Sequence, residues 1–330
     1  MLSTKIAGIG YHVPEKVITN FDLMEMMDTS NEWIIERTGI EKRHYVSEGE
    51  GTSDLGAAAA RQAIEMAGIA TEEIDLIICA TISSDYFFPG SAFQIQDKLG
   101  LNGIGAFDIK VACSGFIYGL SIADQFIKTG QYKNILLVGG EVLSCALDIS
   151  TEGRDMAVLF GDGAGAVILQ PCAGESKIYS SHLHADGKYS QALWAEVPAC
   201  NLKPHISHEL LDQGRQYPHM NGREVFRHAI MRFPQVINEA LDANNLTKED
   251  ISLIIPHQAN LRITQAVAKR LDLTMDKVYS NIHKYGNTTA ASIPIAMCEA
   301  LAEGKFKRGD NLILASFGAG FSWGATALRY

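Results

Sequence analysis

The sequence lacks the patterns that mark several functional classes. Its six cysteines are scattered over 330 residues without a CxxC pair, which excludes a zinc-binding cysteine cluster and a dense disulfide framework and is typical of a reducing compartment. It has no run of lysine and arginine that could follow a phosphate backbone, and its formal net charge is −10. We therefore predict no metal site and no nucleic-acid partner.

Long apolar stretches are absent as well. No uninterrupted apolar run approaches the roughly 20 residues needed to span a bilayer, and residues 1–8 contain no apolar core of an export signal. We expect a cytoplasmic protein without a membrane anchor.

The sequence does contain the alternation that is typical of an α/β protein. Short, β-branched apolar runs at residues 74–81 and 135–140 alternate with helix-like segments at residues 55–67 and 121–129. Short apolar runs between turn residues indicate parallel strands that are buried on both faces. An α/β fold class follows from this pattern.

An internal repeat runs through the chain. Residues 72–78 match residues 249–255 with an offset of 177, and Gly130 matches Gly304 in a similar turn with an offset of 174. Repetition at a nearly fixed offset indicates a duplicated α/β unit. We predict an N-terminal half at residues 1–175 and a C-terminal half at residues 176–330.

Three polar residues stand at predicted corners between a strand and a helix. Cys113 follows an apolar run, His257 follows the strand of the second repeat, and an offset of 174 pairs Cys113 with Asn287. The positive end of a helix and a nearby imidazolium would shift a thiol toward the thiolate, and ligands bind at the carboxyl ends of strands in such folds. Taken singly, each residue has a structural alternative: a buried core cysteine, a capping or packing histidine, and an asparagine N-cap.

Two further segments could support a site. The glycine-rich residues 316–324 lack the spacing of a phosphate-binding loop, so we interpret Gly318, Ala319 and Gly320 as a tight turn whose N–H groups face an oxyanion. Thr29 and Glu32 form a capping-box pattern with Gly39 as the stop, which predicts a helix carrying Trp33 and Arg37 on one face.

The motifs around these residues resemble a known family. Cys113 in ACSGF, His257 in PHQANLRI and Asn287 in YGNTTAAS are similar to β-ketoacyl-acyl-carrier-protein synthase III, and the similarity runs from Gly8 to Tyr330. The resemblance implies a thiolase-like fold of five layers, αβαβα, internally duplicated, and a homodimer. It implies an acyltransferase that condenses an acyl-CoA primer with malonyl-acyl carrier protein to start fatty-acid synthesis, with coenzyme A as part of the substrate and no further cofactor.

The resemblance also implies a role for each site residue. Cys113 would carry the acyl group, and His257 and Asn287 would hold the oxygen of the enolate formed when malonyl loses carbon dioxide. Backbone N–H groups at Cys113 and at residues 318–320 would form the oxyanion hole. The implied binding residues are, for coenzyme A and its pantetheine arm, Trp33, Arg37, Arg154, Gly222, Phe226 and Asn260; for the carrier protein, Arg262, Lys269 and Arg270; and, for the partner's acyl pocket, Phe88.

One segment departs from the family pattern. Residues 193–219, with three histidines and three prolines, are longer than expected of an enzyme with a short primer. This segment motivates an alternative, a related condensing enzyme or acyltransferase of secondary metabolism. A catalytically silent subunit with the same fold is a third hypothesis, which predicts loss of the cysteine, histidine or asparagine.

Overall fold

Two β-sheets organise the chain in the computed structural model, which describes residues 2–173 and 177–330. In the first sheet β4 pairs in parallel with β5 and β6, whereas β7 runs antiparallel to β1 and β6. The strands of this sheet, in spatial order, are β1 (Ser3–His12), β7 (Gly163–Cys172), β6 (Ile135–Glu141), β4 (Leu76–Ala80) and β5 (Gly105–Ile109).

The second sheet is built in the same way. Its strands β11 and β12 are parallel, and β13 runs antiparallel to β12 and β8. In spatial order they are β11 (Leu253–Pro256), β12 (Asn311–Gly318), β13 (Ser322–Arg329) and β8 (Lys177–Ala185).

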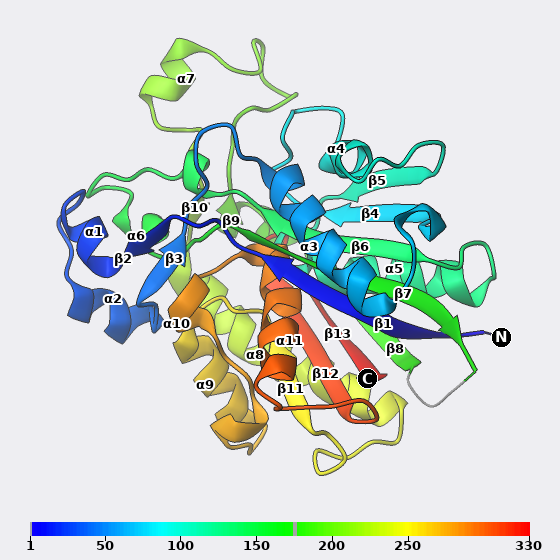
Figure 1. Cartoon of the computed structure of the whole chain (residues 1–330). Coiled ribbons are helices and arrows are strands. Elements are labelled where there is room, and N and C mark those ends of the chain that lie inside the picture. Colours follow the sequence, from blue (N-terminus) through cyan, green and yellow to red (C-terminus); the bar gives the residue numbers. More distant parts are fainter. Residues whose placement is uncertain (1, 174–176) are drawn as a thin grey trace.

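Helices cover both sheets and fill the space between them, so that five layers follow one another (Figure 1). The predicted αβαβα fold is therefore what the chain adopts. The layers are formed, in order, by α3 (Thr52–Ala67) and α4 (Ser91–Lys98), the first sheet, α5 (Gly115–Lys128) and α11 (Ser292–Ala302), the second sheet, and α8 (Gly222–Ala243) and α9 (Leu261–Arg270).

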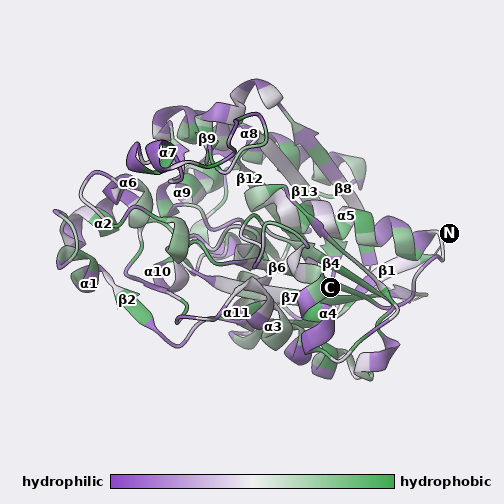
Figure 2. Ribbon diagram, turned by 90° about the horizontal axis from the view of Figure 1, so that it is seen from above, coloured by the Kyte–Doolittle hydropathy of each residue, from purple (hydrophilic) through white to green (hydrophobic). Residues whose placement is uncertain are grey.

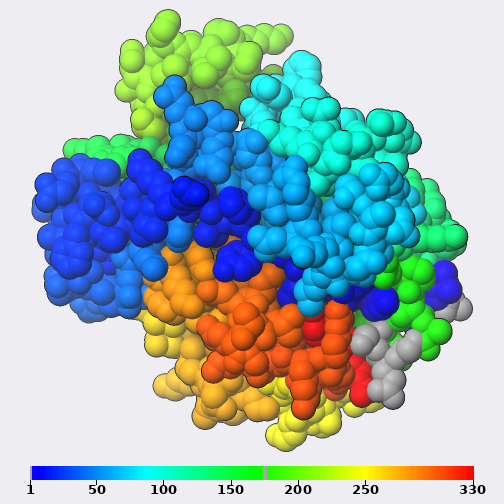
Figure 3. Space-filling view, in the orientation of Figure 1, coloured from blue at the N-terminus to red at the C-terminus, as the bar shows by residue number. Residues whose placement is uncertain are grey.

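Smaller elements gather at one end of the layers. Two short strand pairs and several short helices lie there, and α7 belongs to a mostly hydrophilic projection that stands out from the body (Figures 2 and 3). These elements are α1 (Asn20–Met24), α2 (Asn31–Thr38), α6 (Arg154–Ala157), α7 (His208–Asp212), α10 (Ile282–Tyr285), β2 (Val17–Thr19) with β3 (Lys42–His44), and β9 (Leu193–Trp194) with β10 (His219–Met220).

The central helices show why the sequence forms these layers. Helix α11 has the sequence SIPIAMCEALA, and its first six residues are all buried, because the sheets enclose it from two sides. A helix that is apolar on all sides is stable only in such a position. Among the described residues, no helix is both long and apolar enough to cross a membrane.

The structure corrects one pairing within the repeat. A tight turn precedes each central helix, at residues 112–114 and 289–291, and Ala112 (φ 45°) and Thr289 (φ 44°) occupy the same left-handed conformation 177 residues apart. Cys113 therefore corresponds to Ala290, and the predicted pairing with Asn287 is wrong by three residues. Helix α11 has 11 residues and α5 has 14, so the offset changes from 177 before these helices to 174 after them.

The predicted boundary between the halves, at residues 175 and 176, lies outside the described residues. The strands of the first sheet end at Cys172 and those of the second sheet start at Lys177.

Candidate active site

Cys113 lies in the tight turn between β5 and α5. Cys113 and Ser114 are buried, and the preceding Ala112 takes a positive φ that an L-residue adopts only under strain. Gly115 starts α5 next to the sheet, where a Cβ atom would lie 2.9 Å from the Cβ of Ala80. The turn therefore fixes the thiol at the N-terminal end of a helix that packs closely against β4.

Burial makes Cys113 a neutral thiol in the free site. Its pKa is raised to about 12, first by desolvation and then by the charge of Glu141, although backbone N–H groups of Cys113 and Ala319 act in the opposite direction. The prediction of a thiol shifted toward the thiolate is therefore wrong for the unliganded site. The helix terminus is present, but the loss of water around the sulfur outweighs it.

His257 directly follows β11, as predicted. Its backbone N–H donates to Ala315 O (2.8 Å), and its Nδ1 lies 2.7 Å from Ser292 Oγ. Burial lowers the pKa of the imidazole to about 3, so the ring is neutral at neutral pH, not the imidazolium that the sequence suggested. Its Nε2 is buried and without a hydrogen-bond partner. When Ser292 donates to Nδ1, Nε2 carries the ring proton and can donate it to a ligand.

Asn287 is held by its backbone and by one end of its amide. Its N–H donates to Leu159 O (2.8 Å), and its carbonyl accepts from Gly161 N (3.1 Å). The side-chain Oδ1 accepts from Thr289 N (2.9 Å), which leaves the Nδ2 group as a donor. Asn287 is thus not the N-cap of a helix, because the turn at residues 289–291 separates it from α11.

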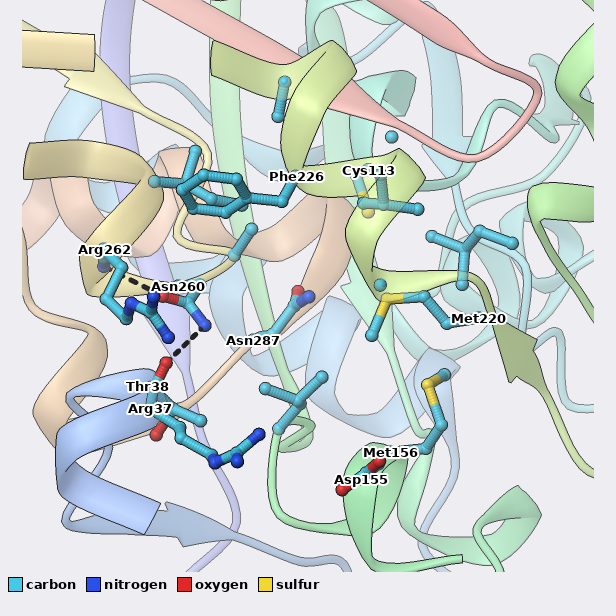
Figure 4. A pocket seen from close by; sticks show the side chains of 18 of the residues that line it. Arg37, Thr38, Cys113, Asp155, Met156, Met220, Phe226, Asn260, Arg262 and Asn287 are labelled. Atoms are coloured by element: carbon cyan, nitrogen blue, oxygen red, sulfur yellow. Dashed lines mark hydrogen bonds between the residues drawn. The ribbon is translucent and has the colours of Figure 1, made fainter. Parts of the chain in front are cut away.

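Cys113, His257 and Asn287 all line one cavity of about 370 Å³. Figure 4 shows Cys113 and Asn287 in this cavity. Five of the six predicted coenzyme A and pantetheine residues line the same cavity, together with Arg262 and Gly318; they are Trp33, Arg37, Gly222, Phe226 and Asn260. Arg154 lies next to this cavity, on the ring of Trp33. The residues that the sequence singled out as candidates for one site therefore also lie together in space.

The glycine-rich turn packs directly against Cys113. A Cβ atom at Gly318 would lie 2.5 Å from Cys113 Cβ and 3.0 Å from its Sγ, so only glycine fits. Ser316 Oγ also donates to Cys113 O (2.7 Å), which ties β12 to the turn. Ala319 lines a second cavity, whereas Gly320 lines neither of the two.

That second cavity, of about 810 Å³, is also lined by Cys113. It shares Cys113, Met156, Phe160 and Leu193 with the first cavity, and apolar side chains form much of its wall. Sequence reasoning missed it, because its lining comes from segments that no common motif connects. Examples of its wall residues are Ile18, Tyr45, Leu143, Ile149 and Trp194.

Comparisons with known proteins agree with this geometry. A family model described as 3-oxoacyl-[acyl-carrier-protein (ACP)] synthase III matches residues 107–187, and the model of its C-terminal part matches residues 241–330. The beta-ketoacyl-[acyl-carrier-protein] synthase III of Clostridioides difficile is 46% identical over 325 residues, which is 98% of each chain. The enzyme of the same name from Xanthomonas euvesicatoria is 45% identical over 99% of this chain and 98% of its own.

A solved structure supports the same assignment. The 3-oxoacyl-[acyl-carrier-protein] synthase III of Aquifex aeolicus is 44% identical, with a TM-score of 0.91 over 99% of this chain and 100% of its own. The chain belongs to the synthase III family. It is therefore an acyltransferase of the condensing type, and the family and fold expected from the sequence are confirmed.

The ring of Trp33 in α2 is flanked by two guanidinium groups. Helix α2 begins after Ser30, whose Oγ accepts from Trp33 N (3.1 Å), so the predicted cap at Thr29 is wrong by one residue. Gly39 ends the helix with φ 77°, as predicted. The guanidinium carbons of Arg37 and Arg154 lie 4.7 and 5.1 Å from the ring centroid of Trp33.

Helix α9 is hydrogen-bonded to helix α2 through its N-cap residue. Asn260 caps the helix by accepting from Arg262 N (2.8 Å) and donates to Arg37 O (2.9 Å) (Figure 4). The guanidinium of Arg262 lies 5.9 Å from the ring centroid of Phe226. Lys269 and Arg270 are exposed in the last turn and line neither cavity.

Phe88 lies away from both cavities of its own chain. It is 80% exposed, and the neighbouring Phe87 is 68% exposed. The ring of Phe87 stacks on His205 at 6.1 Å, so this loop contacts the long segment at residues 193–219. The base of that segment is closed by the pairing of β9 with β10 and by an ion pair between Glu196 and Arg215.

Proposed function

We propose that this protein condenses an acyl-CoA primer with malonyl-acyl carrier protein, releases carbon dioxide and so initiates fatty-acid synthesis. The observation that carries the proposal is the position of Cys113, His257 and Asn287 on one cavity. The names of relatives that are 44–46% identical over nearly the whole chain support it.

In the first half-reaction the sulfur of Cys113 attacks the thioester carbon of the primer. A new carbon–sulfur bond forms, the bond to coenzyme A breaks, and the proton of Cys113 leaves with the coenzyme A thiol. The N–H groups of Cys113 and Ala319 already lower the pKa of the thiol, so they are in position to stabilise negative charge beside it. The acyl chain then extends into the second cavity.

In the second half-reaction malonyl thioester occupies the first cavity. Loss of carbon dioxide leaves an enolate, and its oxygen accepts hydrogen bonds from His257 Nε2 and Asn287 Nδ2. Both groups are neutral and buried, so they bind an oxyanion without a competing water shell. The enolate carbon attacks the acyl carbon, the bond to the Cys113 sulfur breaks, and the released thiolate takes up a proton from solvent to restore the thiol.

The substrate arm follows residues that line the first cavity. Trp33, with the guanidinium groups of Arg37 and Arg154, offers a stacking surface for the adenine ring, and the pantetheine arm passes Gly222 and Phe226. The coenzyme A thioester is a substrate in this account, and no further cofactor takes part.

Two surfaces are assigned to partners. The exposed cations of α9, Arg262, Lys269 and Arg270, would receive the acidic carrier protein. Phe88 would cross to a second copy in a homodimer and close the acyl cavity of that copy, which fits its exposure here. The enzyme would act in the cytoplasm.

The mass of the intact protein after mixing with acyl-CoA tests the proposal. A series of acyl-CoA lengths should give one acyl adduct on the wild-type protein and none on Cys113→Ala. An adduct that persists in Cys113→Ala, or no adduct with any short or medium primer, would contradict it. The length that reacts fastest also reports the size of the acyl cavity.

A further inference from the structure

A serine hydroxyl contacts the imidazole of His257 from outside both cavities. Ser292 is the first residue of α11, is 2% exposed and lines neither cavity. Its Oγ lies 2.7 Å from His257 Nδ1, whereas the buried Nε2 has no partner. The hydroxyl therefore touches the ring but not the substrate, so any effect on the reaction passes through the imidazole.

The hydrogen bonds of Ser292 determine where its own hydrogen points. The backbone N–H of Gln258 donates to the Ser292 oxygen (3.3 Å). Apart from this donor and His257 Nδ1, the hydroxyl has no partner within residues 2–173 and 177–330. A buried hydroxyl hydrogen that donates to nothing is costly, so Ser292 donates to Nδ1, which is then the ring nitrogen without a proton.

The opposite tautomer has the ring proton on Nδ1. That proton would point at Ser292 Oγ or at the backbone of Thr289, which also faces the ring and raises its pKa. Nε2 would then be an acceptor and could not donate to the enolate oxygen. This tautomer also leaves the Ser292 hydrogen without an acceptor in the part of the chain that the structure describes, so the hydrogen-bond geometry disfavours it.

The loop that carries His257 is fixed beside Ser292. Gln258 is 1% exposed, and its side-chain amide uses both hydrogens and both lone pairs of its oxygen. Its four partners are Pro256 O (2.7 Å), Tyr279 O (3.3 Å), Ser280 Oγ (2.9 Å) and Asn281 N (3.2 Å). The backbone at residues 257 and 258 therefore keeps the imidazole within reach of the hydroxyl.

The corner at Cys113 has no such hydroxyl. With the offset of 177 that relates the two turns, Ser292 corresponds to Gly115, the first residue of α5. A side chain is disfavoured there, because a Cβ atom would lie 2.9 Å from the Cβ of Ala80. The hydroxyl thus belongs to the corner that faces His257 and not to the one that carries the nucleophile.

We propose that Ser292 is a positioning residue: its hydroxyl donates to His257 Nδ1 and so keeps the ring proton on Nε2, where it can be donated to the enolate oxygen. This inference rests on the proposed function and adds a residue to its second half-reaction. A protonated Nε2 has no lone pair, so it cannot receive the proton of Cys113 in the first half-reaction. Loss of the hydroxyl should therefore slow the release of carbon dioxide and spare acylation.

The variants Ser292→Ala and Ser292→Thr test it, with the two half-reactions measured separately. Release of carbon dioxide from malonyl-acyl carrier protein should fall by about 10- to 100-fold in Ser292→Ala, whereas acylation of Cys113 stays within about threefold. Ser292→Thr keeps the hydroxyl and should release carbon dioxide within about threefold of the wild-type rate. In a His257→Ala background, Ser292→Ala should cause no further loss, because it acts through the imidazole.

The nuclear magnetic resonance spectrum of isotope-labelled histidine reports the tautomer directly. The signal that His257→Ala lacks should show a proton on Nε2 in the wild-type protein, and Ser292→Ala should change that pattern. Thr326→Val is the matched control, because it removes a fully buried hydroxyl, bonded to Ser181 Oγ (2.8 Å), outside both cavities. It should leave the spectrum of His257 and both half-reactions unchanged.

Three results would overturn the inference while the proposed function stands. They are a ring proton on Nδ1 of His257 in the wild-type protein, release of carbon dioxide at the wild-type rate in Ser292→Ala, and a parallel loss of acylation in that variant. If the wild-type protein forms no acyl adduct, the inference and the proposed function both fail.

Discussion

The two corners before the central helices, at residues 112–114 and 289–291, have the same backbone conformation but contribute different chemical groups to the site. Ala112 and Thr289 have the same left-handed φ at equivalent positions of the repeat. The first corner places a thiol next, at Cys113, whereas the second places Ala290 there, and the backbone N–H of Thr289 holds the side chain of Asn287. A duplicated scaffold can thus divide one reaction, with the covalent step in one half and the stabilisation of charge in the other.

The largest expected effect separates the two corners by removing the nucleophile. Cys113→Ala should lower acylation and condensation by about 10⁴-fold or more, because no other group at the site can carry the acyl chain. The same variant should still release carbon dioxide from malonyl-acyl carrier protein, since His257 and Asn287 remain. Loss of both half-reactions, measured with radiolabelled malonyl groups, would argue against the division.

The next largest effect should come from adding a methyl group at Gly318, a residue of the C-terminal half that packs against the Cys113 turn. Gly318→Ala places a Cβ atom 2.5 Å from Cys113 Cβ, so either the turn or the thiol must shift. A displacement of about 1 Å predicts a loss of about 100-fold in acylation rate. Gly187→Ala is the control, because a Cβ atom there meets nothing within 4 Å. Equal acylation rates for the two variants would show that the turn does not constrain the sulfur.

The pH dependence of Cys113 alkylation tests whether burial keeps the thiol of the first corner neutral. With the pKa of Cys113 raised to about 12 by burial, the thiolate fraction rises about tenfold per pH unit below that value. Alkylation of Cys113 by iodoacetamide should therefore rise steadily from pH 7 to pH 10 without a plateau. A plateau near pH 8 would indicate an ordinary or activated thiol and contradict the account of its burial.

The smallest expected effect concerns the stability of α2, the helix that carries Trp33. Ser30→Ala removes the side-chain acceptor of Trp33 N and should lower the opening free energy of α2 by about 1 kcal/mol, measured by hydrogen exchange at the Trp33 amide. Thr29→Ala is the paired control and should change it by less than about 0.5 kcal/mol. A larger effect of Thr29→Ala than of Ser30→Ala would show that Thr29 is the N-cap, as the sequence predicted.

Much of this site could be predicted from the sequence, since motifs and strand ends are local features. The corners at Cys113 and His257 and the helix carrying Trp33 and Arg37 are where the pattern places them. The pairing of Cys113 with Asn287 could not be predicted correctly, because the difference in length between α5 and α11 is invisible to a fixed offset.

Properties that depend on surroundings were also beyond the sequence. The charge states of Cys113 and His257 follow from burial by distant segments, which reverses the direction expected from a helix terminus alone. The second cavity likewise joins residues that are far apart in the chain. Such features require the folded arrangement of both halves.

The division of labour between the corners is tested most directly by the two half-reaction rates of Asn287→Ala in rapid-quench experiments. The account predicts that the acyl group reaches Cys113 within about threefold of the wild-type rate, while release of carbon dioxide falls by about 10²- to 10³-fold. Release of carbon dioxide at the wild-type rate, or an equal loss in both half-reactions, would contradict it.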